Sequence, residues 1–335
     1  MKEALYYKKL EKYVVQCNLC PRNCTIQESA TGNCGVRRNI KGILYSLVYG
    51  KPCTVNIDPI EKKPLFHFIP GSTTYSIATA GCNFHCLNCQ NWTISQAKFE
   101  QVAYRIMPPE KVVEDALKND CESISYTYTE PTIFYEYMLD IAKLAKKQHI
   151  KNVLVSNGYI NQEPLKLLCK YIDAANIDLK SIKEDFYKDI CSGKLKPVLD
   201  TLKTLKEKKI WIEVTNLIIP ELNDKLEEIK KLCEWVKNNL DKNTPLHFSK
   251  FFPMQRIINK PATPEETLKK AKEIAEKIGL KFVYIGNTNI EDSENTYCPK
   301  CKSLLIERAN LSTFENNLQD GKCNKCKKKL PGIWY

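Results

Sequence analysis

Between Tyr75 and Ile285 the sequence alternates short runs rich in β-branched residues with longer amphipathic segments. The runs expected as strands are YSIATA, SISYTY, NVLVSN, AANIDL, WIEVTNLII, LHFSKF and KFVYI. The segments expected as helices are 109–118, 132–148, 162–171, 197–208, 224–238 and 264–278. Such alternation predicts parallel strands joined by crossover helices. Because six or seven units are too few for an eight-stranded barrel, we predict an α/β fold with a partial (β/α)6-type barrel.

Polar residues follow several of these expected strands directly. Cys82 comes after YSIATAG, Glu130 after SISYTY and Asn157 after NVLVS, and Asp178 closes AANID. In barrels of this kind the chemistry collects at the carboxyl ends of the strands. We therefore expect these residues to converge on one face.

The composition changes on both sides of the expected barrel. We predict an N-terminal cysteine-rich module with a β-rich lead-in over residues 1–73, the barrel over residues 74–287 and a C-terminal tail over residues 288–335. No stretch approaches the roughly 18 apolar residues that a membrane span needs, and the N-terminus lacks a signal peptide's apolar core. We expect a cytoplasmic protein without a membrane partner.

Eleven of the 16 cysteines fall into three tight groups. Because the cytoplasm keeps thiols reduced, the groups indicate metal binding rather than disulfides. The middle group has the spacing C-x3-C-x2-C and contains Cys82, Cys86 and Cys89. Three thiolates on a four-iron cluster leave one iron without a protein ligand, and that open position can receive a small chelating molecule.

Together with their surroundings, these cysteines resemble the radical SAM superfamily. The chain is similar to the activating enzymes related to pyruvate formate-lyase activating enzyme, and most of all to the AmmeMemoRadiSam system radical SAM enzymes. The segments that carry the likeness are CNLCPRNCTIQESATGNCGVRRN, DPIEKKPLFHFIPGS, GCNFHCLNCQNWTIS, YTYTEPT, LIIPELND, HFSKFFP and LPGIWY. The resemblance implies a [4Fe-4S] cluster, S-adenosylmethionine and a 5′-deoxyadenosyl radical that abstracts hydrogen from a substrate.

The resemblance also implies roles for individual residues. Cys82, Cys86 and Cys89 would ligate three irons, and the fourth iron would bind the methionyl amine and carboxylate of S-adenosylmethionine. The residues that would contact this cofactor are Thr127, Tyr128, Thr129, Glu130, Asn157, Asp178, Lys180, Thr215, Asn216 and His247. For Glu130 an alternative stays open, because a carboxylate at the start of a helix also complements the helix dipole.

The other two cysteine groups also have metal-ligand spacing. Cys298, Cys301, Cys323 and Cys326 form two CxxC knuckles, which predict a zinc ribbon with a structural ion. Cys17, Cys20, Cys24 and Cys34 could hold zinc or a second iron–sulfur cluster. For this group we favour a structural metal, although spacing alone does not select between zinc and iron.

The formal net charge of +12 would fall on binding metal–thiolate groups, and the lysines are spread among glutamates, as on solvated helix faces. We expect ferredoxin or flavodoxin as the electron donor, and nucleic acid is not favoured as a partner. One alternative is an activase that acts on a glycine of a partner protein. A non-enzymatic alternative is a basic zinc-ribbon protein that binds nucleic acid. The sequence does not name the substrate.

Overall fold

The computed structural model describes residues 1–335, and its centre is one eight-stranded sheet. In spatial order the strands run β14-β13-β12-β11-β10-β9-β8-β7. Their bounds are β7 Thr54–Pro59, β8 Thr73–Ala78, β9 Ser123–Tyr126, β10 Lys151–Ser156, β11 Ala174–Asp178, β12 Trp211–Ile218, β13 Leu246–Lys250 and β14 Val283–Gly286. All neighbours from β8 to β14 pair in parallel, whereas β7 pairs antiparallel with β8. The seven expected strands and the partial barrel are confirmed.

Helices connect the parallel strands, as the alternation predicts. Their bounds are α1 Trp92–Ser95, α2 Pro109–Lys118, α3 Tyr135–Lys147, α4 Gln162–Leu168, α5 Glu184–Asp189, α6 Leu195–Glu207, α7 Leu226–Asn239 and α8 Glu265–Ile278. Short 3-10 turns cover Ile60–Lys62, Phe99–Gln101 and Pro131–Phe134. The expected helix over 132–148 begins later because a 3-10 turn occupies its start. Helices α1 and α5 were not among the expected helices, and they are only four and six residues long.

The strands of the barrel are buried along most of their length. Every residue of β9 is buried, and β8, β11 and β12 each have only one or two residues that are not. Near-continuous apolar burial is typical of parallel strands covered on both faces. Most of their buried apolar side chains belong to one large hydrophobic cluster together with the inner faces of the helices.

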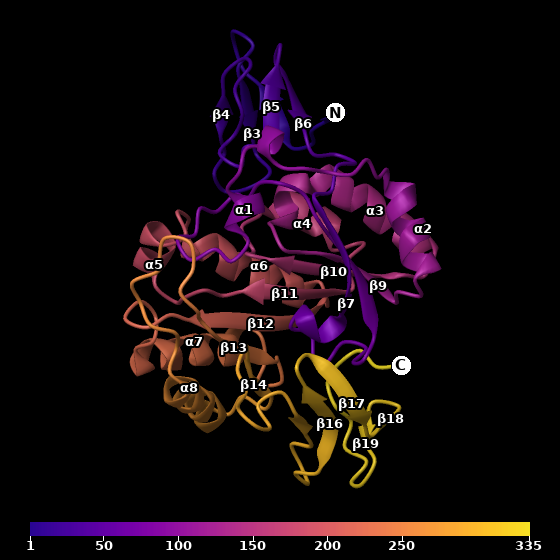
Figure 1. Ribbon diagram of the computed structural model, residues 1–335, viewed down its shortest axis with the longest axis vertical. Coiled ribbons are helices and arrows are strands. Elements are labelled where there is room, and N and C mark those ends of the chain that lie inside the picture. The colour runs from indigo at the N-terminus through magenta and orange to yellow at the C-terminus, as the bar shows by residue number, and fades with distance from the viewer.

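Small antiparallel sheets lie at the two ends of the molecule (Figure 1). The N-terminal sheets contain β1 Lys2–Glu3, β2 Tyr7–Lys9, β3 Val15–Cys17, β4 Thr25–Ile26, β5 Arg37–Ile40 and β6 Ile43–Ser46. The C-terminal sheets contain β15 Thr296–Tyr297, β16 Leu304–Ala309, β17 Ser312–Asn316, β18 Leu318–Gln319 and β19 Lys322–Cys323. Figure 1 places the first group above the central sheet and the second group below it.

Buried polar contacts attach both ends to the barrel. Arg37 of β5 pairs with Glu136 of α3 at 3.0 Å, and both side chains are 2% exposed. At the other end, the Ile69 amide donates to the Ile333 carbonyl at 2.7 Å, and Arg308 donates to the Phe66 carbonyl. A buried charge is costly unless it is paired, so these contacts hold the end modules in defined positions.

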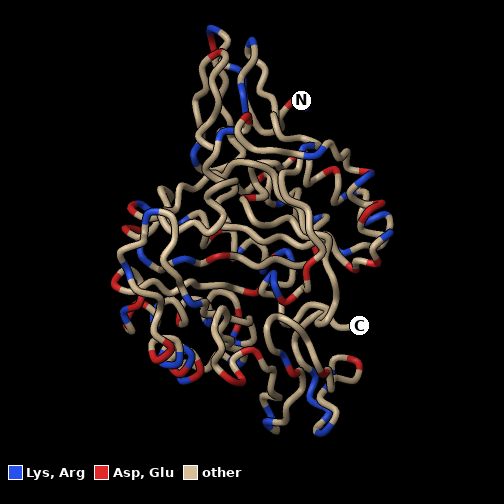
Figure 2. Tube along the Cα trace, viewed as in Figure 1, with Lys and Arg blue, Asp and Glu red and all other residues tan.

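Charges of both signs are interspersed along the surface helices (Figure 2). On α8, Lys270 and Lys277 each pair with a glutamate four residues earlier. Such pairs are expected on a solvated helix face. No helix of the chain is long and apolar enough to cross a membrane.

Candidate active site at the carboxyl edge of the sheet

The loop that follows β8 carries Cys82, Cys86 and Cys89. It begins at Gly81, whose φ is +96° and where a Cβ atom would lie 2.6 Å from the carbonyl oxygen of Cys34. Only glycine fits this close approach without strain. The amides of His85 and Leu87 then donate to backbone carbonyls of residues 191 and 190 at 3.1 and 3.0 Å. The loop is therefore anchored on both the N-terminal module and the segment after α5.

The three thiols of this loop lie close enough together to affect one another's pKa values. Burial raises the pKa of Cys82, followed by the nearby carboxylate of Glu130 and then by the Cys86 thiol. Cys86 is also buried, and a hydrogen bond with Cys191 lowers its pKa. Burial raises the pKa of Cys89, and the Lys180 cation opposes that rise and also helps to lower the pKa of Cys86. A buried group of thiols beside a lysine suits thiolate ligands of a metal cluster.

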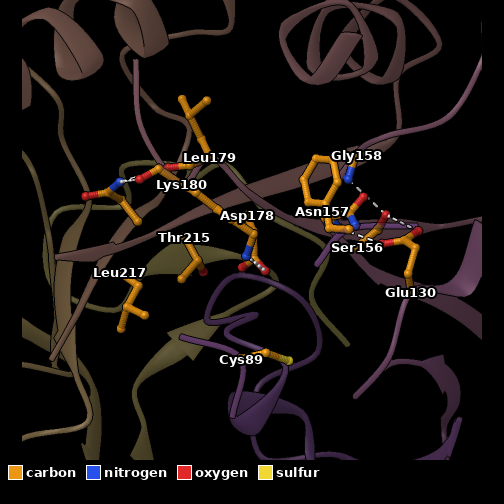
Figure 3. Close-up of polar contacts among 12 residues, drawn as sticks. Cys89, Glu130, Ser156, Asn157, Gly158, Asp178, Leu179, Lys180, Thr215 and Leu217 are labelled. Carbon is orange, nitrogen blue, oxygen red and sulfur yellow. Dashed lines mark hydrogen bonds and ion pairs between the residues drawn. The ribbon is translucent and has the colours of Figure 1, made fainter. Parts of the chain in front are cut away.

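Glu130 is the acceptor at the centre of a buried hydrogen-bond group (Figure 3). Its Oε1 atom accepts from the Thr132 amide at 2.9 Å, the Thr132 hydroxyl at 2.6 Å and the Ser156 hydroxyl at 2.8 Å. Its Oε2 atom accepts from the Asn157 amide at 2.8 Å. Burial raises the pKa of Glu130, although these hydrogen bonds oppose the rise. Glu130 is thus both the cap of the turn 131–134 and a neighbour of Cys82.

Asn157 connects this group to the cysteine loop. Its Nδ2 atom donates to Asn83 Oδ1 at 2.9 Å and lies 3.9 Å from Cys82 Sγ. The ends of β8, β9 and β10 are therefore joined by side chains, as the strand-end pattern predicts. Ser156 and Asn83 complete the connection, and the signal that could have found them is their position directly beside Asn157 and Cys82 in the sequence.

Residues 127–129 approach the loop through their backbone. Tyr128 has a φ of +61°, which is uncommon for a bulky residue and costs energy. Its carbonyl accepts from Asn91 Nδ2 at 2.7 Å, while its hydroxyl donates to Asp58. The Thr129 hydroxyl donates to the Thr79 carbonyl at 2.8 Å, and Thr127 is buried. The tyrosine hydroxyl therefore contacts the lead-in strand β7.

Farther along the sheet edge, the predicted cofactor contacts have protein partners. Lys180 Nζ pairs with Asp178 Oδ2 at 2.9 Å (Figure 3). Burial opposes the charge on Lys180, but the Asp178 carboxylate and the Cys86 thiol raise its pKa. Asn216 donates to the carbonyls of residues 179 and 180 at 2.8 and 3.1 Å, so it positions the loop that carries Lys180.

His247 and Thr215 lie on neighbouring strands and line the same cavity of about 560 Å³. His247 Nε2 is 2.7 Å from Oε2 of Glu213, a fully buried carboxylate that the sequence did not single out. The Thr215 hydroxyl donates to Asn176 at 2.9 Å. The cavity is lined by residues from β13, the segment after β14, the lead-in and the C-terminal module, and most of these residues are polar or charged. It is wide enough for a small organic ligand.

The C-terminal cysteines form a compact group. The sulfur atoms of Cys298, Cys301, Cys323 and Cys326 all lie within 4.8 Å of one another. Cys298 and Cys326 are 3.5 Å apart, and Cys301 and Cys323 are 3.6 Å apart. The amide of residue 326 and the Ser303 hydroxyl lower the pKa of Cys323 to about 6, which favours the thiolate. This group could bind a single metal ion in a tetrahedral shell.

We expect purified protein to contain about one zinc ion per chain at this group, and Cys323→Ser to remove it. The substitution removes one of the four sulfur ligands of the ion. The short strands around the group cannot replace that ligand. Metal analysis of both proteins after desalting tests this expectation. Cys53→Ser, at a half-buried cysteine outside the three groups, is the matched control. An unchanged zinc content in the Cys323→Ser variant would contradict the prediction of a zinc ribbon.

The N-terminal cysteines Cys17, Cys20, Cys24 and Cys34 line one cavity next to the active-site loop. The structure thus brings the N-terminal and middle groups together and leaves the C-terminal group apart, at the other end of the molecule (Figure 1). The middle group also gains Cys191, which belongs to none of the three groups in the sequence. No local pattern could have placed it against Cys86.

Comparisons with known proteins agree with this site. The model of the Radical SAM superfamily matches residues 76–236, which include the cysteine loop, Glu130 and Asn157. Uncharacterized protein MJ0808 of Methanocaldococcus jannaschii is 48% identical over 98% of this chain and 99% of its own length. The pyruvate formate-lyase-activating enzyme of Clostridium pasteurianum is 26% identical over 47% of this chain and 67% of that enzyme.

A solved structure has the same fold. The crystal structure of Streptococcus suis SuiB bound to precursor peptide SuiA superposes with a TM-score of 0.52 at 14% identity. The superposition covers 69% of this chain and 52% of SuiB. At this identity the likeness concerns the arrangement of strands and helices alone.

Proposed function

Because this chain belongs to the radical SAM superfamily, we propose that it cleaves S-adenosylmethionine reductively at a [4Fe-4S] cluster held by Cys82, Cys86 and Cys89. When bound, the cluster and S-adenosylmethionine supply one-electron reduction of the sulfonium and a 5′-deoxyadenosyl radical that abstracts hydrogen from a substrate. The observation that carries the proposal is the grouping of three thiols beside Glu130 and Asn157 at the carboxyl edge of a parallel sheet.

The chain's own residues would bind and orient the cofactor. Glu130 Oε2 accepts only one hydrogen bond, so it retains capacity for a second donor such as the methionyl ammonium. Asn157 Nδ2, between Asn83 and Cys82, would fix the side of the cluster that faces this carboxylate. Lys180 offsets the negative charge of the thiolates. These groups are held by buried hydrogen bonds, which keeps the site preorganised.

We assign the cavity beside His247 and Thr215 to the remaining parts of the cofactor and to the substrate. Glu213 holds the imidazole of His247 in one orientation through the 2.7 Å contact. Lys62, Lys250 and Glu294 also line the cavity. A lining of both charges suits a polar substrate rather than a hydrocarbon. Ferredoxin or flavodoxin remains the proposed electron donor.

A glycyl-radical activase is the second candidate function. It is favoured by the likeness to the pyruvate formate-lyase-activating enzyme, which extends over 47% of this chain. On this alternative, the same cavity would admit a glycine-bearing loop of a partner protein. We also propose that the chain is of the AmmeMemoRadiSam type, on the N-terminal CNLCPRNC and closing LPGIWY segments.

The decisive experiment is anaerobic reconstitution followed by chromatography for methionine and 5′-deoxyadenosine. With a strong reductant, we expect the loaded protein to form both products from S-adenosylmethionine in equal amounts. Addition of a true substrate should accelerate their formation, and deuterium from that substrate should appear in the 5′-deoxyadenosine. Reconstituted protein that holds its cluster but forms neither product would refute the proposal.

A further inference from the structure

The N-terminal cysteine group differs in geometry from the C-terminal one. Cys17 ends β3, Cys20 and Cys24 lie on the turn before β4, and Cys34 precedes β5. All four line a single cavity between the N-terminal sheets and the barrel. The C-terminal sulfurs all lie within 4.8 Å of one another, but no three of these N-terminal sulfurs do.

Different metal groups need different distances between their sulfur ligands. Four thiolates at about 2.3 Å from one zinc ion lie only about 3.8 Å apart in a tetrahedron. In a four-iron cluster each thiolate binds a different iron, so the sulfurs stand farther apart. Cys82, Cys86 and Cys89 are likewise not within 4.8 Å of one another. The N-terminal group, like the cluster-binding loop, therefore lacks the compact spacing of the tail.

We propose that Cys17, Cys20, Cys24 and Cys34 hold a second [4Fe-4S] cluster. This differs from the structural metal favoured by their spacing in the sequence. A four-thiolate cluster is anionic, so its pocket needs donors and positive charge. Arg37 lines the cavity, is 2% exposed and has a buried Nε atom without any hydrogen-bond acceptor.

The other donors of Arg37 are occupied. Its Nη1 atom pairs with Glu136 at 3.0 Å, and its Nη2 atom donates to the carbonyl of residue 5 at 2.7 Å. A buried donor without a partner destabilises the folded chain. A cysteine thiolate or a cluster sulfide would supply that partner.

The proposed cluster would lie next to the radical SAM cluster. Asn83, which follows Cys82, lines the same cavity, and so does Thr132, which donates to Glu130. Arg22 from the turn between Cys20 and Cys24 donates to the Asn83 carbonyl at 2.5 Å. An electron from a low-potential one-electron carrier would reduce the N-terminal cluster. Passing that electron on would reoxidise it and reduce the cluster on Cys82.

The test uses the full chain with Cys82→Ala, Cys86→Ala and Cys89→Ala together, reconstituted anaerobically with iron and sulfide. We expect about four irons per chain and the Mössbauer signature of a [4Fe-4S] cluster. Adding Cys20→Ser and Cys34→Ser should remove this iron. Because the variant lacks the radical SAM ligands, the result does not depend on the proposed function. Absence of cluster iron in the variant, with a second zinc ion, would overturn the inference.

Unaltered protein provides an independent measurement if the multiple variant fails to fold. It should bind about eight irons. Addition of S-adenosylmethionine should change the Mössbauer signal of only one of these irons, the one without a protein ligand. A count of about four irons would overturn the inference. After reduction, the two neighbouring clusters should broaden each other's electron paramagnetic resonance signals. Unbroadened signals from two reduced clusters would rule out the electron transfer between them.

Discussion

Replacing Cys86 with alanine should abolish cleavage of S-adenosylmethionine. Cys86 is the buried central thiol of the loop, and a cluster that has lost one of only three protein ligands cannot be held in place. The measurement is chromatography for 5′-deoxyadenosine and methionine after anaerobic reconstitution. Iron analysis and a melting curve of the same sample would show whether the cluster is lost while the fold remains.

The matched control is Cys169→Ala, at a half-buried cysteine that follows α4 and belongs to none of the three groups. This variant should retain its iron and form both products at the normal rate. Full cleavage activity in the Cys86→Ala protein would contradict the assignment of the cluster to this loop.

Glu130→Gln should weaken S-adenosylmethionine binding about ten- to a hundredfold, while the cluster spectrum stays intact. The substitution removes the negative charge that we assign to the methionyl ammonium. It also places an amide N–H group against donors from Thr132 or Asn157, so the melting temperature should fall as well. Equilibrium titration of the cofactor into cluster-loaded protein and a melting curve measure the two effects separately.

Glu163→Gln is the control for this variant, because Glu163 lies in the first turn of α4 with its side chain 78% exposed. It should alter neither the dissociation constant nor the cluster. If Glu130→Gln lowered only the melting temperature and left the affinity unchanged, Glu130 would act as a helix cap alone.

The barrel could be predicted because its signals are local. Runs such as NVLVSN and AANIDL are apolar and β-branched, and the segments between them have helical periodicity, so each element can be identified from neighbouring residues. The antiparallel pairing of β7 with β8 could not be read in this way. Strand pairing depends on which edge of the sheet remains open after the other strands have paired. The positions of the short helices α1 and α5 depend on the loops that they join.

The sequence by itself determined the three cysteine groups, the order of the strands along the chain and the polar residues at their ends. Each of these features is carried by spacing over a few residues. Only the tertiary structure decided that Cys191 lies against Cys86, that Glu213 holds His247, and that the N-terminal cysteine cavity adjoins Asn83. These contacts join residues that are 34 to 105 positions apart or belong to different modules. Packing of the elements brings them together, and the packing also sets the distances between the sulfur atoms within each cysteine group.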